Sequence, residues 1–203
     1  VKGSMYNKKV VVYDYGSGNY ESIFSCVKKI NYNVDVSNKI SELKKADLII
    51  LPGVANYITA MKTINKNNKN KFLDLIKKGK KVLGICLGMQ LLTKSSTEIK
   101  KTDGLKIISA ETILNTKGSH IGWNSIFVSK KSIYNCLNNK IFYFQHDYKS
   151  VKLKKKYDQG FSKNGEVITS FFVNKNITGV QFHPEKSQEN GLFFLKTYFE
   201  KNL

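Results

Sequence analysis

The sequence predicts an α/β fold, in which one domain is built on a mostly parallel, doubly wound sheet with flanking helices and a short antiparallel β portion. In the first half, short apolar runs alternate with helical segments, as they do in βαβ units. The 203 residues suffice for one core, and 41% hydrophobic with 12% aromatic content excludes a disordered chain. No apolar run reaches the roughly 18 residues of a transmembrane helix.

The elements of the first half follow from these apolar runs and from the glycines and prolines between them. Each strand is a continuous buried-type run, and each helix shows apolar residues at helical spacing. The predicted strands cover 10–13, 47–51 and 81–85. The predicted helices cover 20–30, 56–66, 70–79 and 87–92.

From about residue 104 the pattern changes to short strands and turns, and a last helix closes the chain. The predicted strands cover 121–128, 140–145, 167–173 and 177–182, and the helix covers 190–201. Without a repeat or linker, we expect one domain over 5–203. Val1–Ser4, ahead of Met5, is interpreted as an expression remnant, and the lysines of Lys152–Lys156 predict an exposed loop or strand edge.

The net charge of +19 first suggests a nucleic acid or another anionic surface as partner. However, every basic residue is lysine, and recognition of bases and phosphates relies on bidentate arginine. We therefore favour solvated lysines under compositional drift, and expect neither a nucleic-acid nor a membrane partner. A lysine-rich anion-binding protein with an inactive site stays as a disfavoured alternative.

The three cysteines, Cys26, Cys86 and Cys136, are too far apart in the sequence for a zinc pattern. We expect no metal and no cofactor. An odd cysteine count without a visible signal peptide indicates a reducing, cytoplasmic compartment, in which one thiol can serve as a nucleophile.

The segment Gly84-Ile85-Cys86-Leu87-Gly88 has the layout of a nucleophile elbow between a strand and a helix. The glycines leave room around the sulfur, and the start of the following helix favours a thiolate. The backbone N–H of Leu87 would point towards an oxyanion. The alternative is a buried structural cysteine beside two ordinary glycines.

A second signal is His183-Pro184-Glu185 at the end of a predicted strand. In an extended segment residues i and i+2 face the same side, so His183 could act as a base and Glu185 could orient it. A lone strand histidine is more often structural, but its place downstream of a cysteine elbow favours a Cys–His–Glu triad. Gly53-Val54, at the end of another strand, could supply a second oxyanion N–H or simply terminate that strand.

These motifs resemble class I (triad-type) glutamine amidotransferases, and more narrowly the glutaminase subunits of imidazole glycerol phosphate synthases. The resemblance covers nearly the whole chain after the remnant, and the segment around the single tryptophan is typical of the narrower group. The matching segments are 14–19, 51–54, 84–92, 120–124, 144–148, and 181–187 followed by Gly191-Leu192.

The resemblance implies hydrolysis of glutamine to glutamate and ammonia through a γ-glutamyl thioester. It assigns catalysis to Cys86, His183 and Glu185, and the oxyanion hole to the backbones of Val54 and Leu87. The implied glutamine-binding positions are Gly53, Gln90, His146, Asp147 and Tyr148. Those near a partner interface and ammonia channel are Asn19, His120 and Trp123.

The resemblance also implies a heterodimer with a (β/α)8 synthase subunit, which uses the ammonia to make imidazole glycerol phosphate and aminoimidazole carboxamide ribotide in histidine biosynthesis. A paralogous subunit serving a barrel-type partner that amidinates a bacterial surface sugar is the leading alternative. A different cysteine hydrolase on the same sheet is disfavoured, because it would not need the Gly122-Trp123-Asn124 segment.

Four positions depart from the family pattern. Ala55 replaces a usual glycine, Asp147 a usual Ser or Thr, and Ser119 a usual proline, while Glu21 stands where arginine is common. All four lie at positions that the resemblance places near the substrate or the partner, and none belongs to the triad.

Overall fold

The computed structural model describes residues 8–16, 18–66 and 68–203. The interpreted remnant Val1–Ser4 and Ser17 of the first glycine turn therefore lie outside the described residues.

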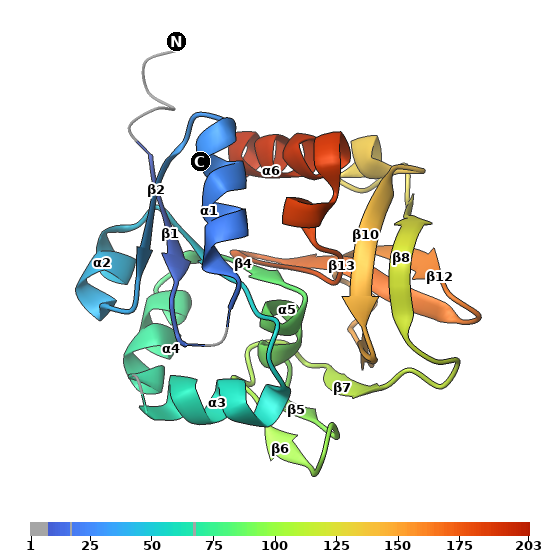
Figure 1. The fold of residues 1–203 in the computed structure, drawn as a ribbon, viewed down its shortest axis with the longest axis horizontal. Coiled ribbons are helices and arrows are strands. Elements are labelled where there is room, and N and C mark those ends of the chain that lie inside the picture. The colour runs from blue at the N-terminus through green and yellow to red at the C-terminus, as the bar shows by residue number, and fades with distance from the viewer. Residues whose placement is uncertain (1–7, 17, 67) are drawn as a thin grey trace.

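The main sheet has eight strands among the described residues, in the order β2-β1-β3-β4-β14-β13-β12-β9 (Figure 1). The parallel strands are β1 (Lys9–Tyr13), β2 (Asn33–Ser37), β3 (Leu48–Leu51), β4 (Lys81–Ile85) and β14 (Ile177–Val180). The antiparallel strands are β13 (Val167–Asn174), β12 (Asp158–Lys163) and β9 (Phe127–Val128). The predicted fold class is confirmed.

Helices cover both faces of the parallel part, as a doubly wound sheet requires (Figure 1). One face carries α1 (Tyr20–Lys29) and α6 (Gln188–Asn202), and the other carries α2 (Ile40–Lys45), α3 (Tyr57–Lys66), α4 (Lys69–Lys77) and α5 (Leu87–Leu91). Successive residues of β1 alternate between the two cores: Val10 packs with the α1 and α6 side chains, and Val11 with those of α2–α5.

The antiparallel portion holds two smaller sheets. The β8–β10 ribbon, β8 (His120–Ser125) paired with β10 (Ile141–His146), stands beside the main sheet. The other small sheet has the order β11-β7-β5-β6. Its strands are β11 (Tyr148–Val151), β7 (Glu111–Leu114), β5 (Ser95–Ser96) and β6 (Thr102–Asp103). Two short 3₁₀ helices complete the described chain, η1 (Asn135–Leu137) and η2 (Pro184–Lys186).

The differences from the predicted elements lie where apolar patterning is weak. The single strand expected over 121–128 is divided at the buried Ile126 into β8 and β9, which belong to different sheets. The edge strand β2 was not predicted, because only one of its five residues is buried. The lysines of Lys152–Lys156 are exposed after β11, as expected.

No helix in the described part of the chain is long and apolar enough to cross a membrane. The carboxyl ends of β1, β3, β4 and β14 meet at one edge of the sheet. This edge gathers residues 14–16, 18–19, 52–54, 86 and 181–183 from the segments that the sequence singled out.

Candidate active site

Cys86 occupies a strained turn between β4 and α5. Its backbone has φ 51° and ψ −109°, a left-handed region that a non-glycine residue rarely adopts. The turn needs its glycines: a Cβ on Gly88 would lie 1.7 Å from the Leu51 carbonyl oxygen, and one on Gly84 would lie 2.8 Å from the Gly88 backbone. The close packing of β3, β4 and α5 therefore fixes the Cys86 sulfur at the carboxyl edge of the sheet.

His183 and Glu185 meet through a 2.7 Å hydrogen bond between Nδ1 and Oε1. Both side chains are nearly buried, at 3% and 6% exposed. The local backbone differs from the expectation of an extended i, i+2 pair, because Pro184 starts the 3₁₀ turn η2 directly after His183. The turn brings the two side chains together through backbone curvature rather than through strand alternation.

The electrostatics of His183 reflect its two neighbours. Burial alone disfavours the charged ring, but the charge and hydrogen bond of the Cys86 sulfur, together with the Glu185 carboxylate, raise the pKa of His183 to about 10. A protonated imidazole beside a cysteine sulfur is the arrangement that stabilises a thiolate. The three residues can thus supply a nucleophile, a proton carrier and an orienting carboxylate.

Gln181 is a further residue at the sulfur. Its side chain is fully buried, with Nε2 3.8 Å from Cys86 Sγ. Gln181 Oε1 accepts a 3.3 Å bond from Gln90 Nε2, which also donates to the Tyr148 carbonyl at 2.9 Å. The sequence analysis gave Gln181 no role, although a glutamine in a buried apolar segment two residues before His183 is a signal.

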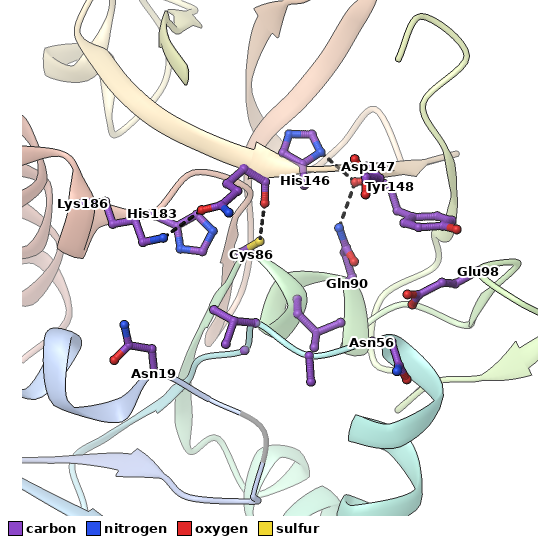
Figure 2. A pocket seen from close by; sticks show the side chains of 15 residues that line it. Asn19, Asn56, Cys86, Gln90, Glu98, His146, Asp147, Tyr148, His183 and Lys186 are labelled. Atoms are coloured by element: carbon purple, nitrogen blue, oxygen red, sulfur yellow. Dashed lines mark hydrogen bonds between the residues drawn. The ribbon is translucent and has the colours of Figure 1, made fainter. Parts of the chain in front are cut away.

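Cys86, His183 and Gln90 line a cavity of about 420 Å³, a volume suited to a small-molecule ligand (Figure 2). The predicted residues that line it are Asn19, Gly53, Val54, Cys86, Leu87, Gln90, His146, Asp147, Tyr148 and His183. Residues without a predicted role also line it: Asn56, Glu98, Gln145 and Lys186. Glu98 is fixed by a 2.6 Å bond that its Oε2 accepts from the Tyr57 backbone N–H.

The segment after β3 faces Cys86 across this cavity. The Tyr15 hydroxyl donates a 2.5 Å hydrogen bond to the Pro52 carbonyl. A Cβ on Gly53 would lie 2.4 Å from the Tyr15 hydroxyl oxygen and 2.9 Å from the Leu87 Cβ, so the backbone here packs closely against the elbow. The Val54 side chain is exposed, while the Gly53 backbone is buried.

Comparison with known proteins agrees with this geometry. Residues 11–201 match the family model for class-I glutamine amidotransferases. This chain belongs to the class-I glutamine amidotransferase family.

Among relatives of this amidotransferase is the imidazole glycerol phosphate synthase subunit HisH of Caldanaerobacter subterraneus subsp. tengcongensis, 35% identical over 93% of this chain and 96% of that protein. The corresponding protein named HisH 2 of Vibrio vulnificus is 38% identical over 95% and 94%. Among solved structures, a glutamine amidotransferase superposes with a TM-score of 0.75 at 16% identity, covering 95% of this chain and 97% of that one. PurLQS from Thermotoga maritima superposes with a TM-score of 0.74 at 16% identity, covering 97% and 99%.

The β8–β10 ribbon of the amidotransferase holds two of the residues expected near a partner interface, Trp123 and His120. Trp123 is half exposed on the outer face, where it contacts Tyr143 edge-to-face at 5.7 Å beside the exposed Ile121. His120 points the other way and is only 3% exposed, so its side chain lies behind the outer face of the ribbon. The alternation of the strand explains this, since 121 and 123 face out while 120 faces in.

Two of the departures from the family pattern lie at the cavity of the amidotransferase. Ala55 is half-buried and lines it beside Val54. Asp147 is exposed at its rim, and the Asp147 carbonyl accepts a 2.8 Å bond from the Asn115 N–H. In the described residues no group of three or more His, Cys, Asp and Glu side chains forms a metal-binding cluster.

Proposed function

We propose that this chain is the glutaminase subunit of an imidazole glycerol phosphate synthase. The observation that carries the proposal is that Cys86 and His183 line one cavity, with Glu185 hydrogen-bonded to His183 behind it, in a chain whose relatives bear that subunit name. The three free cysteines support a reducing, cytoplasmic location.

In the proposed mechanism the Cys86 sulfur attacks the carboxamide carbon of glutamine. The carbon–nitrogen bond breaks as His183 gives a proton to the leaving nitrogen, which departs as ammonia and leaves a γ-glutamyl thioester. Water then attacks the thioester, His183 accepts its proton, and the sulfur is released together with glutamate. Glu185 keeps the imidazole oriented through the 2.7 Å bond in both steps.

The cavity offers groups for each part of glutamine. The backbone N–H groups of Leu87 and Val54 would stabilise the oxyanion. The carboxylates of Glu98 and Asp147 at the cavity wall would attract the α-ammonium group. The side chain of Gln90 and the 146–148 turn, which includes Tyr148, would position the rest of the substrate.

The proposed partner is a (β/α)8 synthase subunit that receives the ammonia and forms imidazole glycerol phosphate and aminoimidazole carboxamide ribotide. The outer face of the β8–β10 ribbon, with Ile121 and Trp123, supplies an apolar docking patch beside the cavity. Asn19 lines the cavity near the start of α1 and would lie at the rim of this interface.

A second candidate sends the ammonia to a barrel-type partner that amidinates a surface sugar. It is favoured by the extra negative charge of Glu21 at an expected partner position. The complex with each candidate partner can be given glutamine and the acceptor of that partner. Only the true partner should aminate its acceptor while glutamine is consumed.

The decisive test of the glutaminase site is Cys86→Ala in the complex. We expect glutamine-dependent synthesis to fall by at least about 1,000-fold, because no other group can form the thioester. Synthesis from added ammonia should stay at the wild-type rate, and this internal control reports an intact partner. Substantial glutamine hydrolysis by the variant would refute the assignment of Cys86 as nucleophile.

A further inference from the structure

Two of the three histidines lie outside the Cys–His–Glu group and are buried beside it. His120 and His146 face each other across the paired strands β8 and β10, with 3% and 7% of their surface exposed. Their rings are 5.0 Å apart, and His120 stacks on Phe144 at 4.2 Å. The mechanism proposed above uses neither ring.

The hydrogen bonds of the pair fix the tautomer of each ring. The Tyr148 carbonyl can only accept, so His146 Nδ1, at 2.8 Å, carries the proton. His146 Nε2 is then an acceptor, and His120 Nδ1 donates to it at 3.2 Å. His120 Nε2 must accept in turn, and the Asn124 amide nitrogen donates to it at 3.2 Å. The other hydrogen of that amide goes to the Lys163 carbonyl at 2.8 Å, so every donor has one acceptor.

The surroundings keep both rings neutral. Burial, aided by His120 and by the charge of His183, lowers the pKa of His146 to about 3, against the opposing effect of the Tyr148 carbonyl. Burial also lowers the pKa of His120. In the described chain neither ring has a carboxylate as hydrogen-bond partner, and Lys163 presents only its carbonyl.

One end of this chain of bonds is the wall of the cavity. The Tyr148 carbonyl receives hydrogen bonds from both His146 and Gln90, at 2.8 and 2.9 Å. Asn115 holds the same turn, because its backbone N–H donates to the Asp147 carbonyl at 2.8 Å and its amide to the His146 carbonyl at 3.2 Å. The Asn115 amide also approaches His146 Nδ1 at 3.4 Å, the longest contact of that nitrogen. The other end is Asn124, next to the half-exposed Trp123.

We propose that His120 and His146 are positioning residues, a neutral pair that sets the main chain of the 146–148 turn and ties it to strand β8. This inference rests on the proposed function for its meaning, since the turn would hold glutamine and β8 would carry the partner-facing Trp123. A shift of β8 on docking would reach the substrate turn through two successive hydrogen bonds, from His120 to His146 and from His146 to the Tyr148 carbonyl, without passing through Cys86 or His183.

The first test reads the tautomers directly and requires no activity. A long-range ¹H–¹⁵N spectrum of the chain holds only three histidine rings. We expect two neutral rings with the proton on Nδ1, the less common form in water, unchanged between pH 5 and 8. A proton on Nε2 of either ring, or titration of either near pH 6.5, would overturn the proposal.

The second test separates positioning of glutamine from general stability. In the partner complex, we expect His120→Phe to raise the glutamine KM roughly 5- to 20-fold with a smaller change in kcat, because the bond to His146 is lost. His120→Asn keeps a donor at the Nδ1 position and should recover much of the loss. Ser162→Ala, which removes a buried hydroxyl from β12, is the matched control and should match the wild type.

A labelling measurement completes this test. An electrophilic glutamine analogue should label Cys86 of His120→Phe more slowly than the wild type, while iodoacetamide should label Cys86 at the same rate in both. Equal slowing with both reagents indicates a general structural effect and overturns the proposal, as does wild-type kinetics of His120→Phe. If the wild-type chain in the partner complex does not hydrolyse glutamine, the proposed function is refuted instead. The tautomers of His120 and His146 can still be read from the spectrum in that case.

Discussion

At the scale of single residues, the contact between His183 and Glu185 sets the proposed proton transfer. We expect Glu185→Gln to lower kcat by about 100-fold, because a neutral amide orients the ring but stabilises its charge poorly. Losing the carboxylate also removes one cause of the raised His183 pKa, so the pKa should fall below about 10. The rate between pH 6 and 10 measures both effects, and Glu189→Gln, at an exposed position of α6, is the control.

One result would contradict this prediction for Glu185. If Glu185→Gln keeps both the wild-type rate and the wild-type pH profile, the charge of Glu185 does not stabilise the protonated His183 ring during turnover.

His146 makes a prediction about acid stability. The pKa of His146 in the folded chain, about 3, lies below the ordinary value of 6.5. Between these two pH values the unfolded chain binds a proton at His146 and the folded chain does not. This contribution to stability is complete above pH 6.5 and is lost as the pH falls towards 3. We expect it to remove about 2 kcal/mol from the free energy of unfolding between pH 7 and 5.

Urea unfolding at pH 7, 6 and 5 tests this prediction against His146→Asn, which carries no titrating ring. His183 has the opposite sign, because the contribution of its raised pKa is complete below pH 6.5 and is lost as the pH rises towards 10. The difference between the two proteins therefore isolates His146. Parallel pH dependences for both proteins would contradict the prediction.

At the scale of elements, the elbow depends on a glycine that lets α5 pack against β3. We expect Gly88→Ala to destabilise the protein by more than about 3 kcal/mol, since the new Cβ would lie 1.7 Å from the Leu51 carbonyl oxygen and no rotamer avoids it. Gly79→Ala is the control: it has φ +91° but no atom within 4 Å, and should cost about 1 kcal/mol. Equal losses on urea unfolding would show that the contact with β3 does not govern the cost at Gly88.

In the first half of the chain, the strands that the sequence predicted are those with continuous apolar runs. β1, β3 and β4 are buried on both faces, so their composition is visible without any partner. β2, β7 and β12 alternate or carry few apolar residues, and their existence depends on the strands beside them.

At the scale of the whole molecule, the β8–β10 ribbon predicts where a partner binds. Ile121 is 65% exposed on its outer face, and Ile133, away from the ribbon between β9 and η1, is 56% exposed. We expect Ile121→Ser to weaken partner binding at least about 10-fold and Ile133→Ser to leave it unchanged. The fluorescence emission of Trp123, the single tryptophan, should shift to shorter wavelength when the partner binds. Trp123→Phe, which has no tryptophan, gives the background signal. Equal affinities of the two serine variants would place the interface elsewhere.

The parallel core, the family resemblance and the candidates Cys86, His183 and Glu185 could be predicted from the sequence. Each of these features depends on a short segment, because strands, elbows and turns form between neighbours within a few residues. The inward position of His120 against His146 and the contact of Gln181 with the Cys86 sulfur are visible only in the folded chain. Those contacts join residues 26 and 95 positions apart, and packing of β8, β10, β4 and the end of β14 brings them together. No local pattern contains that information.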